Sequence, residues 1–166
     1  MAKRKKIKLG LFDILFLAIA GAGFVFALIG ILINWFSNDI SGSVKLFSDS
    51  GIRDFIDEKL TEADVSPIGV IRAFAIIAVV LSGLCAVGVA LKAFDVVRIK
   101  GLLPFLFAGA TIAVGILVAV FSYVYAGDVS VGSESIKVST TVPSVGMYFC
   151  AIGTIAGGAA MLLKRG

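Results

Sequence analysis

The 166-residue sequence contains no histidine, only two cysteines and only three prolines. Without imidazole, histidine-based acid–base catalysis and histidine–metal sites are excluded, and two cysteines cannot complete a structural zinc site. No glycine is followed by lysine, which excludes a phosphate-binding loop of the Gly-Lys type. Charged residues make up only 16% of the chain. These absences exclude most enzyme classes, so we expect a protein that is not an enzyme and has no cofactor and no metal.

What the chain has in excess is apolar surface. Hydrophobic residues make up 59% of the sequence, glycine adds 19 positions, and the mean hydropathy is +1.06. A water-soluble chain of this length cannot bury so much apolar surface, because small domains leave a large share of their residues at the surface. The sequence therefore predicts an integral membrane protein.

Four apolar runs are long enough to cross a bilayer, and they lie at 9–36, 67–91, 102–126 and 145–163. Backbone N–H groups in lipid need internal partners, so each run is predicted to be a helix. The first run would be about 42 Å long as a helix, more than the roughly 30 Å hydrocarbon core, and tilt would accommodate the excess. We expect one membrane domain over 1–166, an all-α bundle of four transmembrane helices.

Basic residues predict the orientation of these spans. The first outer loop, 37–66, and the second, 127–144, together carry nine acidic and four basic residues. The two termini and the loop at 92–101 carry ten basic residues: Lys3, Arg4, Lys5, Lys6, Lys8, Lys92, Arg98, Lys100, Lys164 and Arg165. We therefore expect a plasma-membrane protein with both termini in the cytoplasm.

The start of the chain has a second interpretation. A basic segment, an apolar stretch and Ala18-Ile19-Ala20 together resemble a secretory signal peptide. However, Asp13 interrupts the apolar stretch, and apolar sequence continues without a break to Phe36. We favour a membrane span.

The outer loops predict a small extracellular cap. Residues 44–47 fit a short strand, residues 52–60 fit a short amphipathic helix, and the alternation around 132–133 fits a hairpin. Pairing of the hairpin with the first strand would give a three-stranded sheet. The side chains expected to make outer-loop contacts are Phe47, Phe55, Ile56, Val129, Val131, Ile136 and Val138.

Two charged residues lie inside predicted spans. Asp13 fits either a proton or cation step or an interfacial ion pair with the nearby lysines Lys5, Lys6 and Lys8, and we favour the ion pair. Arg72 fits either snorkelling outward or an ion pair with an outer acid, which would tie its helix to the cap. The residues expected to anchor the cap are Arg72, Asp39, Asp128 and Trp35.

Small residues recur four positions apart within the spans. Gly153 and Gly157 form a Gly-x-x-x-Gly pattern that Gly158 extends, and Gly109 with Ala113 repeats the spacing. Small residues let helices approach closely in lipid. Packing within the bundle and oligomerisation both fit, and packing is favoured because four helices must pack. Cys85 and Cys150 lie within different spans and fit packing better than a disulfide.

The chain resembles the claudin and peripheral-myelin-protein superfamily of four-span proteins. The stretches that carry the resemblance are Val-Ile-Arg-Ala-Phe at 70–74, Phe-Ala-Gly-Ala at 107–110 with Tyr-Ala at 125–126, and Gly-Met-Tyr at 146–148 with Gly-Gly at 157–158. Trp35 lies where that family has a tryptophan after its first helix. The Gly-Leu-Trp motif and the paired cysteines of that family's first outer loop are absent. The resemblance implies cytoplasmic termini and an outer sheet built from both loops.

We expect a non-catalytic structural or assembly protein that acts through lateral helix–helix and extracellular-loop contacts. The alternative is a pore-forming or accessory subunit of a channel or transporter. A pore predicts a continuous polar stripe, whereas the spans offer only isolated hydroxyls at Ser82, Thr111, Ser122 and Thr154. The expected partners are the lipid bilayer and either further copies of the chain or a larger membrane protein, without nucleic acid or small-molecule substrate.

Overall fold

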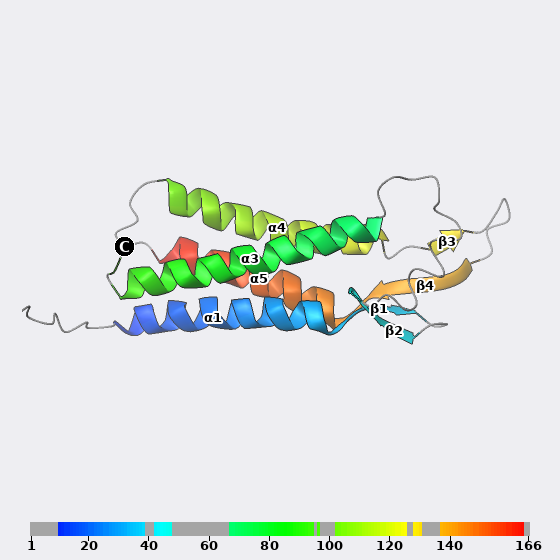
Figure 1. Cartoon of the computed structure of the whole chain (residues 1–166), viewed down its shortest axis with the longest axis horizontal. Coiled ribbons are helices and arrows are strands. Elements are labelled where there is room, and N and C mark those ends of the chain that lie inside the picture. Colours follow the sequence, from blue (N-terminus) through cyan, green and yellow to red (C-terminus); the bar gives the residue numbers. More distant parts are fainter. Residues whose placement is uncertain are drawn as a thin grey trace, which may run out of the picture.

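A computed structural model describes residues 10–38, 42–47, 67–94, 96, 102–125, 128–130 and 137–164. Four helices run side by side along the long axis of the molecule (Figure 1): α1 (Leu11–Leu32), α3 (Pro67–Ala93), α4 (Leu103–Tyr125) and α5 (Val145–Leu163). Each is long and apolar enough to cross a membrane, as the sequence predicts.

Proline positions mark where these elements begin and end. Proline lacks a backbone N–H and disrupts a helix interior, but it is tolerated in the first helical turn. Pro67 is the first residue of α3, Pro104 is the second residue of α4, and Pro143 is the last residue of a strand. No proline therefore interrupts a span.

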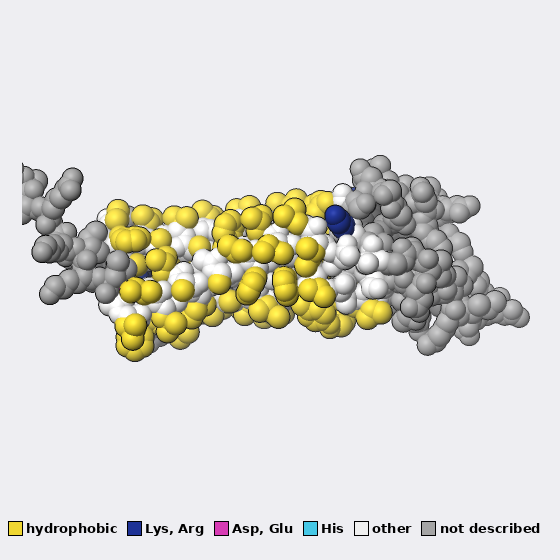
Figure 2. Space-filling view, turned by 90° about the horizontal axis from the view of Figure 1, so that it is seen from below, with side chains coloured by type: hydrophobic (Ala, Val, Ile, Leu, Met, Phe, Trp, Pro, Cys, Tyr) yellow, Lys and Arg dark blue, Asp and Glu magenta, His cyan; other side chains and the backbone are white. Residues whose placement is uncertain are grey.

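The outside of the bundle is apolar. Figure 2 shows a belt of hydrophobic side chains along the length of the helices. Many large apolar side chains of all four helices lie in this belt, including Ile14 and Phe26 of α1, Val80 of α3 and Leu106 of α4. Because exposed apolar surface of this extent is not stable in water, the belt fits a lipid environment.

Helix α5 occupies the centre of the bundle. Both α5 and α3 contact all three other helices, whereas α1 and α4 lie at opposite corners (Figure 1). Over its most apolar stretch, 56% of α5 is buried, compared with 22% of α1. The last helix of the described chain is therefore the most buried of the four.

One end of the bundle carries a small antiparallel sheet, and we refer to it as the sheet end. Its strands are β1 (Asn34–Asn38), β2 (Gly42–Lys45), β3 (Asp128–Ser130) and β4 (Lys137–Pro143). Their order is β2-β1-β4-β3. Residues Gly10 and Lys164 lie at the opposite end, which we call the terminal end (Figure 1).

The first span is shorter than predicted. We expected a helix over 9–36, but α1 ends at Leu32 and residues 34–38 form β1. The indole Nε1 of Trp35 donates a hydrogen bond to the Gly30 carbonyl (2.5 Å). This bond satisfies one of the carbonyls that the last turn of a helix leaves without a partner, so the chain can turn away into the sheet.

The sheet also differs from the predicted one. The hairpin is present as β3 and β4, and the predicted strand at 44–47 corresponds to β2 at 42–45. The two do not pair, because β1 lies between β2 and β4 and gives the sheet four strands. Apolar composition alone does not distinguish the end of a membrane helix from a buried strand, and this explains the error.

Several predictions lie outside the described residues. They are the amphipathic helix at 52–60 with Phe55 and Ile56, the acid Asp39, and the hairpin residues Val131 and Ile136. For Asp128, Val129 and Val138 the structure describes the strand but not the side chain.

Candidate functional site

Glycines bring α1 and α5 into backbone contact. A Cβ atom on Gly23 would lie 2.6 Å from the Gly153 carbonyl oxygen, and one on Gly30 would lie 2.7 Å from the Gly146 carbonyl oxygen. Both distances are too short for a side chain. We call these four residues, Gly23, Gly30, Gly146 and Gly153, the glycine seam.

A short stretch of α5 faces all three other helices. Gly153 faces α1 through the glycine seam, while a Cβ on Gly157 would lie 3.0 Å from the Ser82 Oγ of α3. A Cβ on Gly158 would lie 2.9 Å from the Ala108 carbonyl oxygen of α4. The predicted packing residues of α5 therefore lie at three different helix contacts within six residues of chain.

Gly109 and Ala113 of α4 lie elsewhere. Nothing lies within 4 Å of a Cβ built on Gly109, and both residues are exposed on the outside of the bundle. The predicted packing role does not apply to them within the chain, because the side of α4 that meets α5 carries Ala108 and Gly115 instead. We call Gly109 and Ala113 the outer α4 face.

Sequence reasoning missed three residues of the glycine seam, namely Gly23, Gly30 and Gly146. Gly23 and Gly30 are seven residues apart, which places them on one side of α1 two turns apart. The prediction considered only spacings of four, so it did not pair these two glycines. A search for glycines seven residues apart would have found the correct side of the helix.

Polar side chains in the interior are mostly hydroxyls that bond within their own helix. Thr111, Ser122 and Thr154 each donate to the carbonyl oxygen four residues earlier, at 2.7 to 2.8 Å. The Cys85 sulfur lies 3.3 Å from the Thr111 hydroxyl, and both cysteines are free thiols. Ser82 differs, because its buried Oγ has no hydrogen-bond partner in the described structure.

Arg72 connects α3 to the strand region at the sheet end. Its Nε donates a hydrogen bond to the Leu46 carbonyl (2.7 Å), and its guanidinium carbon lies 5.9 Å from the centre of the Phe47 ring. Leu46 is fully buried in the apolar cluster that also contains Trp35 and Met147. Arg72 thus connects the end of β2 to the start of α3 through a carbonyl and a ring. The side chains of the predicted acidic partners, Asp39 and Asp128, lie outside the described residues.

Two aromatic groups at the sheet end have different surroundings. Trp35 is fully buried in the apolar cluster at the sheet end. Tyr123 of α4 and Tyr148 of α5 are exposed, and their hydroxyls are hydrogen-bonded to each other. Tyrosines with an apolar ring and a polar tip are typical of a membrane–water interface, and the position of this pair fits such an interface.

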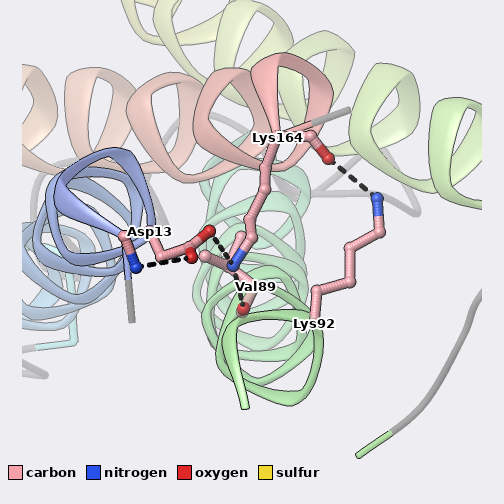
Figure 3. Close-up of polar contacts among 5 residues, drawn as sticks. Asp13, Val89, Lys92 and Lys164 are labelled. Atoms are coloured by element: carbon pink, nitrogen blue, oxygen red, sulfur yellow. Dashed lines mark hydrogen bonds and ion pairs between the residues drawn. The ribbon is translucent and has the colours of Figure 1, made fainter. Parts of the chain in front are cut away.

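A group of polar residues joins three helices at the terminal end (Figure 3). The Asp13 carboxylate of α1 accepts a hydrogen bond from the Gly10 backbone N–H (3.0 Å) and forms an ion pair with Lys164 (3.4 Å). The Lys164 ammonium is buried and also donates to the Val89 carbonyl of α3 (3.3 Å). Lys92 of α3 donates in turn to the Lys164 carbonyl (2.8 Å). We call Asp13, Val89, Lys92 and Lys164 the terminal cluster.

The terminal cluster gives Asp13 a partner that we did not predict. We favoured an ion pair with Lys5, Lys6 or Lys8, and those lysines lie outside the described residues. The structure pairs Asp13 with Lys164 from the far end of the sequence. A carboxylate near the start of α1 and a lysine just after α5 meet because both helices place those ends at the same end of the bundle (Figure 3).

Within the described residues, the histidine, cysteine, aspartate and glutamate side chains form no group of three that could hold a metal ion. Comparison with known proteins finds no matching family model, no similar curated protein and no similar solved structure. The resemblance to the claudin superfamily stays a prediction.

Proposed function

We propose that this protein is a non-catalytic structural or assembly protein of the plasma membrane that acts through lateral helix contacts and through its outer loops. The observation that supports this proposal is the outer α4 face. The glycine seam, Gly157 and Gly158 all lie against neighbouring helices of the same chain, whereas Gly109 and Ala113 do not.

Small residues on an outward helix face have a physical consequence in lipid. Glycine lowers helix stability by about 1 kcal/mol relative to alanine, and it offers lipid little surface to pack against. It does allow a second helix to approach closely, and helix association in lipid depends on such packing. A neighbouring helix against the outer α4 face would use the space that Gly109 leaves open.

The proposed topology places the sheet end outside the cell and both termini in the cytoplasm. The ten basic residues of the termini and the loop at 92–101 support this orientation by the positive-inside rule. The exposed Tyr123 and Tyr148 near the sheet end fit the outer interface. The four helices, the small sheet at one end and an arginine at the start of α3 also fit the claudin-like architecture that the sequence predicts.

The interior supports packing as the role of the helices. The described hydroxyls of Thr111, Ser122 and Thr154 bond to carbonyls of their own helices, and the close contacts between helices are made by glycine. A role as accessory subunit of a channel or transporter is the second candidate, since the outer α4 face would fit a helix of another protein as well.

The test is the mass of the complex extracted in native-like lipid nanodiscs. We expect an oligomer of the wild-type chain, and we expect the Gly109→Leu and Ala113→Leu substitutions together to reduce it to monomers. The matched control is Ala73→Leu, which enlarges another exposed small residue, on α3, and should leave the oligomer unchanged.

Three outcomes contradict self-assembly through the outer α4 face. They are a monomeric wild-type protein, an oligomer that survives both α4 substitutions, and equal disruption by Ala73→Leu. Extraction with a larger membrane protein, lost on Gly109→Leu, would instead favour the accessory-subunit function.

A further inference from the structure

Helices α1 and α4 lie at opposite corners of the bundle, and α3 and α5 each contact both of them (Figure 1). They are the two least buried spans, at 22% and 28% over their most apolar stretches. Both begin at the terminal end, so they cross the bundle in the same direction (Figure 1). Each helix therefore has a side that no other described helix covers.

A row of exposed residues runs along the middle of each of these outward sides. The row on α1 consists of Leu11, Leu15, Ala18, Ala22, Val25 and Ile29. The row on α4 consists of Leu102, Leu106, Gly109, Ala113, Ile116 and Val120, and it includes the outer α4 face. Successive members are alternately four and three residues apart, a spacing that keeps each set on one side of its helix. We call the two sets the α1 row and the α4 row.

The two rows match member by member. From the terminal end, each has two leucines, then two small residues, then two β-branched residues. Counterparts in the two rows are similarly exposed, as Val25 (48%) and Ile116 (50%) show. In both rows the small pair begins seven residues after the first leucine, which is about 10 Å along a helix. The α1 row and the α4 row therefore have nearly the same shape and the same direction.

Two such rows can pack against each other. Alternating spacings of four and three are typical of helices that cross at about 20°. Small residues at the crossing let two helices approach closely, and helix association in lipid depends on this packing. The chain already joins α1 to α5 in this way, through the glycine seam. A Cβ built on Gly109 has nothing within 4 Å, so the α4 row has room for such a neighbour.

We propose that the α1 row of one copy packs against the α4 row of the next copy, so that the chains associate head to tail. This inference rests on the proposed self-assembly, and it identifies α1 of a second copy as the partner of the outer α4 face. Because the two rows lie at opposite corners, a copy that has bound one neighbour still has one row free. Contacts of this kind repeat and give a ring or an open chain.

The matching rows favour this contact over a two-fold contact between two α4 helices. A two-fold α4 contact would cover the α4 row of both copies but leave every α1 row in lipid, including Ala18 and Ala22. The head-to-tail contact covers both rows with one kind of interface. It also predicts assemblies larger than a dimer, whereas a two-fold contact closes at two copies.

Two double variants each block one row. Ala18→Leu with Ala22→Leu fills the α1 row, and Gly109→Leu with Ala113→Leu fills the α4 row. All four residues are exposed, so the larger side chains extend away from the bundle. In lipid nanodiscs we expect the wild-type protein to be larger than a dimer and each double variant to be a monomer. Circular dichroism checks that both variants keep the wild-type helix content.

A mixture of the two blocked variants tests the direction of the contact. One variant keeps its α4 row and the other keeps its α1 row, so the two can bind each other once. Mixed in equal amounts in detergent and then reconstituted, they should form mixed dimers that do not grow further. A different affinity tag on each variant identifies the mixed dimer.

The matched control is Gly69→Leu with Ala73→Leu. It enlarges two exposed small residues that are also four positions apart, but on α3, and a Cβ on Gly69 has nothing within 4 Å. This variant should assemble like the wild type. Loss of assembly equal to that of the blocked variants would overturn the proposed contact.

The remaining outcomes separate this inference from the proposed function. An α1-blocked variant that assembles like the wild type, beside a monomeric α4-blocked variant, would overturn the head-to-tail contact but leave assembly through α4 intact. A mixture that stays monomeric would also overturn the head-to-tail contact. A monomeric wild-type protein would contradict both the inference and the proposed self-assembly.

Discussion

Ser82 and Gly157 face each other inside the bundle, and their contact shows how single atoms decide the packing. The Ser82 Oγ is fully buried and has no hydrogen-bond partner among the described residues. A Cβ on Gly157 would lie 3.0 Å from this oxygen but 3.8 Å from the Ser82 Cβ. The hydroxyl, and not the serine backbone, is therefore what prevents a larger residue at position 157.

This geometry predicts a compensating pair of substitutions. Gly157→Ala should lower the free energy of unfolding by about 1–2 kcal/mol, because the new methyl group crowds the hydroxyl. Ser82→Ala should raise stability by about 1 kcal/mol, because it removes a buried group without a partner. The double variant should unfold close to the wild type, measured by thermal denaturation in detergent.

Gly153→Ala provides the matched control. A Cβ at position 153 would lie 2.6 Å from the Ala27 backbone nitrogen of α1. Because this clash is with backbone atoms of α1, Ser82→Ala cannot relieve it. A rescue of Gly153→Ala by Ser82→Ala, or no rescue of Gly157→Ala, would contradict this account. The Gly-x-x-x-Gly spacing identifies both glycines from sequence, but it does not indicate which neighbour each one meets.

At the scale of elements, two sets of contacts hold the sheet to the bundle. One lies where α1 continues into β1, and the other lies between the end of β2 and α3. Trp35 binds the Gly30 carbonyl at the end of α1, and the Ser144 N–H donates to the Trp35 carbonyl (2.7 Å). Arg72 holds Leu46 and Phe47 at the end of β2. The sheet is thus attached to α1 through the Trp35 indole of β1 and to α3 through the Arg72 side chain.

Loss of the Arg72 contact should loosen the end of β2. A hydrogen bond from a charged group contributes about 1.5 kcal/mol or more to stability. Arg72→Leu should therefore raise, about tenfold, the population of molecules in which the end of β2 is detached from α3. We expect correspondingly faster cleavage between positions 46 and 67 by proteinase K in detergent, with fragments identified by mass. This protease is chosen because it does not require a basic residue at the cut.

Lys45→Leu is the matched control, because Lys45 is an exposed basic residue on β2 that directly precedes Leu46. It should leave the cleavage rate unchanged. Equal rates for Arg72→Leu and wild type would contradict the role assigned to Arg72.

The element boundaries could be predicted where proline or charge marks them. Pro67, Pro104 and the polar Ser144 place the starts of α3, α4 and α5 within one residue of the prediction. The end of α1 could not be predicted, because Ile33, Trp35 and Phe36 are as apolar as the helix that precedes them. The hydrogen bond between the Trp35 indole and the Gly30 carbonyl, five residues earlier, shows in the structure where the helix stops.

For the whole molecule, the bundle is held by different forces along its length. Glycine contacts join the helices through the middle, the sheet joins them at one end, and the terminal cluster joins α1, α3 and α5 at the other. Periodicity and the positive-inside rule predict the number of helices and which ends lie together. They do not predict that Asp13 pairs with Lys164, because the two residues are at opposite ends of the sequence.

The terminal cluster predicts an unequal effect of its two charges. Asp13→Asn should lower the thermal midpoint most, because it leaves the buried Lys164 ammonium without its carboxylate. Lys164→Met should have a smaller effect, because Asp13 is partly exposed and still accepts the Gly10 N–H. The double variant Lys164→Met with Asp13→Asn should lower the thermal midpoint less than Asp13→Asn alone. Additive losses in the double variant would contradict a direct interaction.

The central position of α5 also has a consequence for biosynthesis. Synthesis proceeds from the N-terminus, so α1, α3 and α4 leave the ribosome before α5, the helix that contacts all of them. Until α5 is synthesised, Gly23 and Gly30 of α1 lack the α5 backbone that covers them in the complete bundle. In a chain interrupted before residue 145, α3 could still contact α1 and α4, but we expect the glycine face of α1 to stay uncovered.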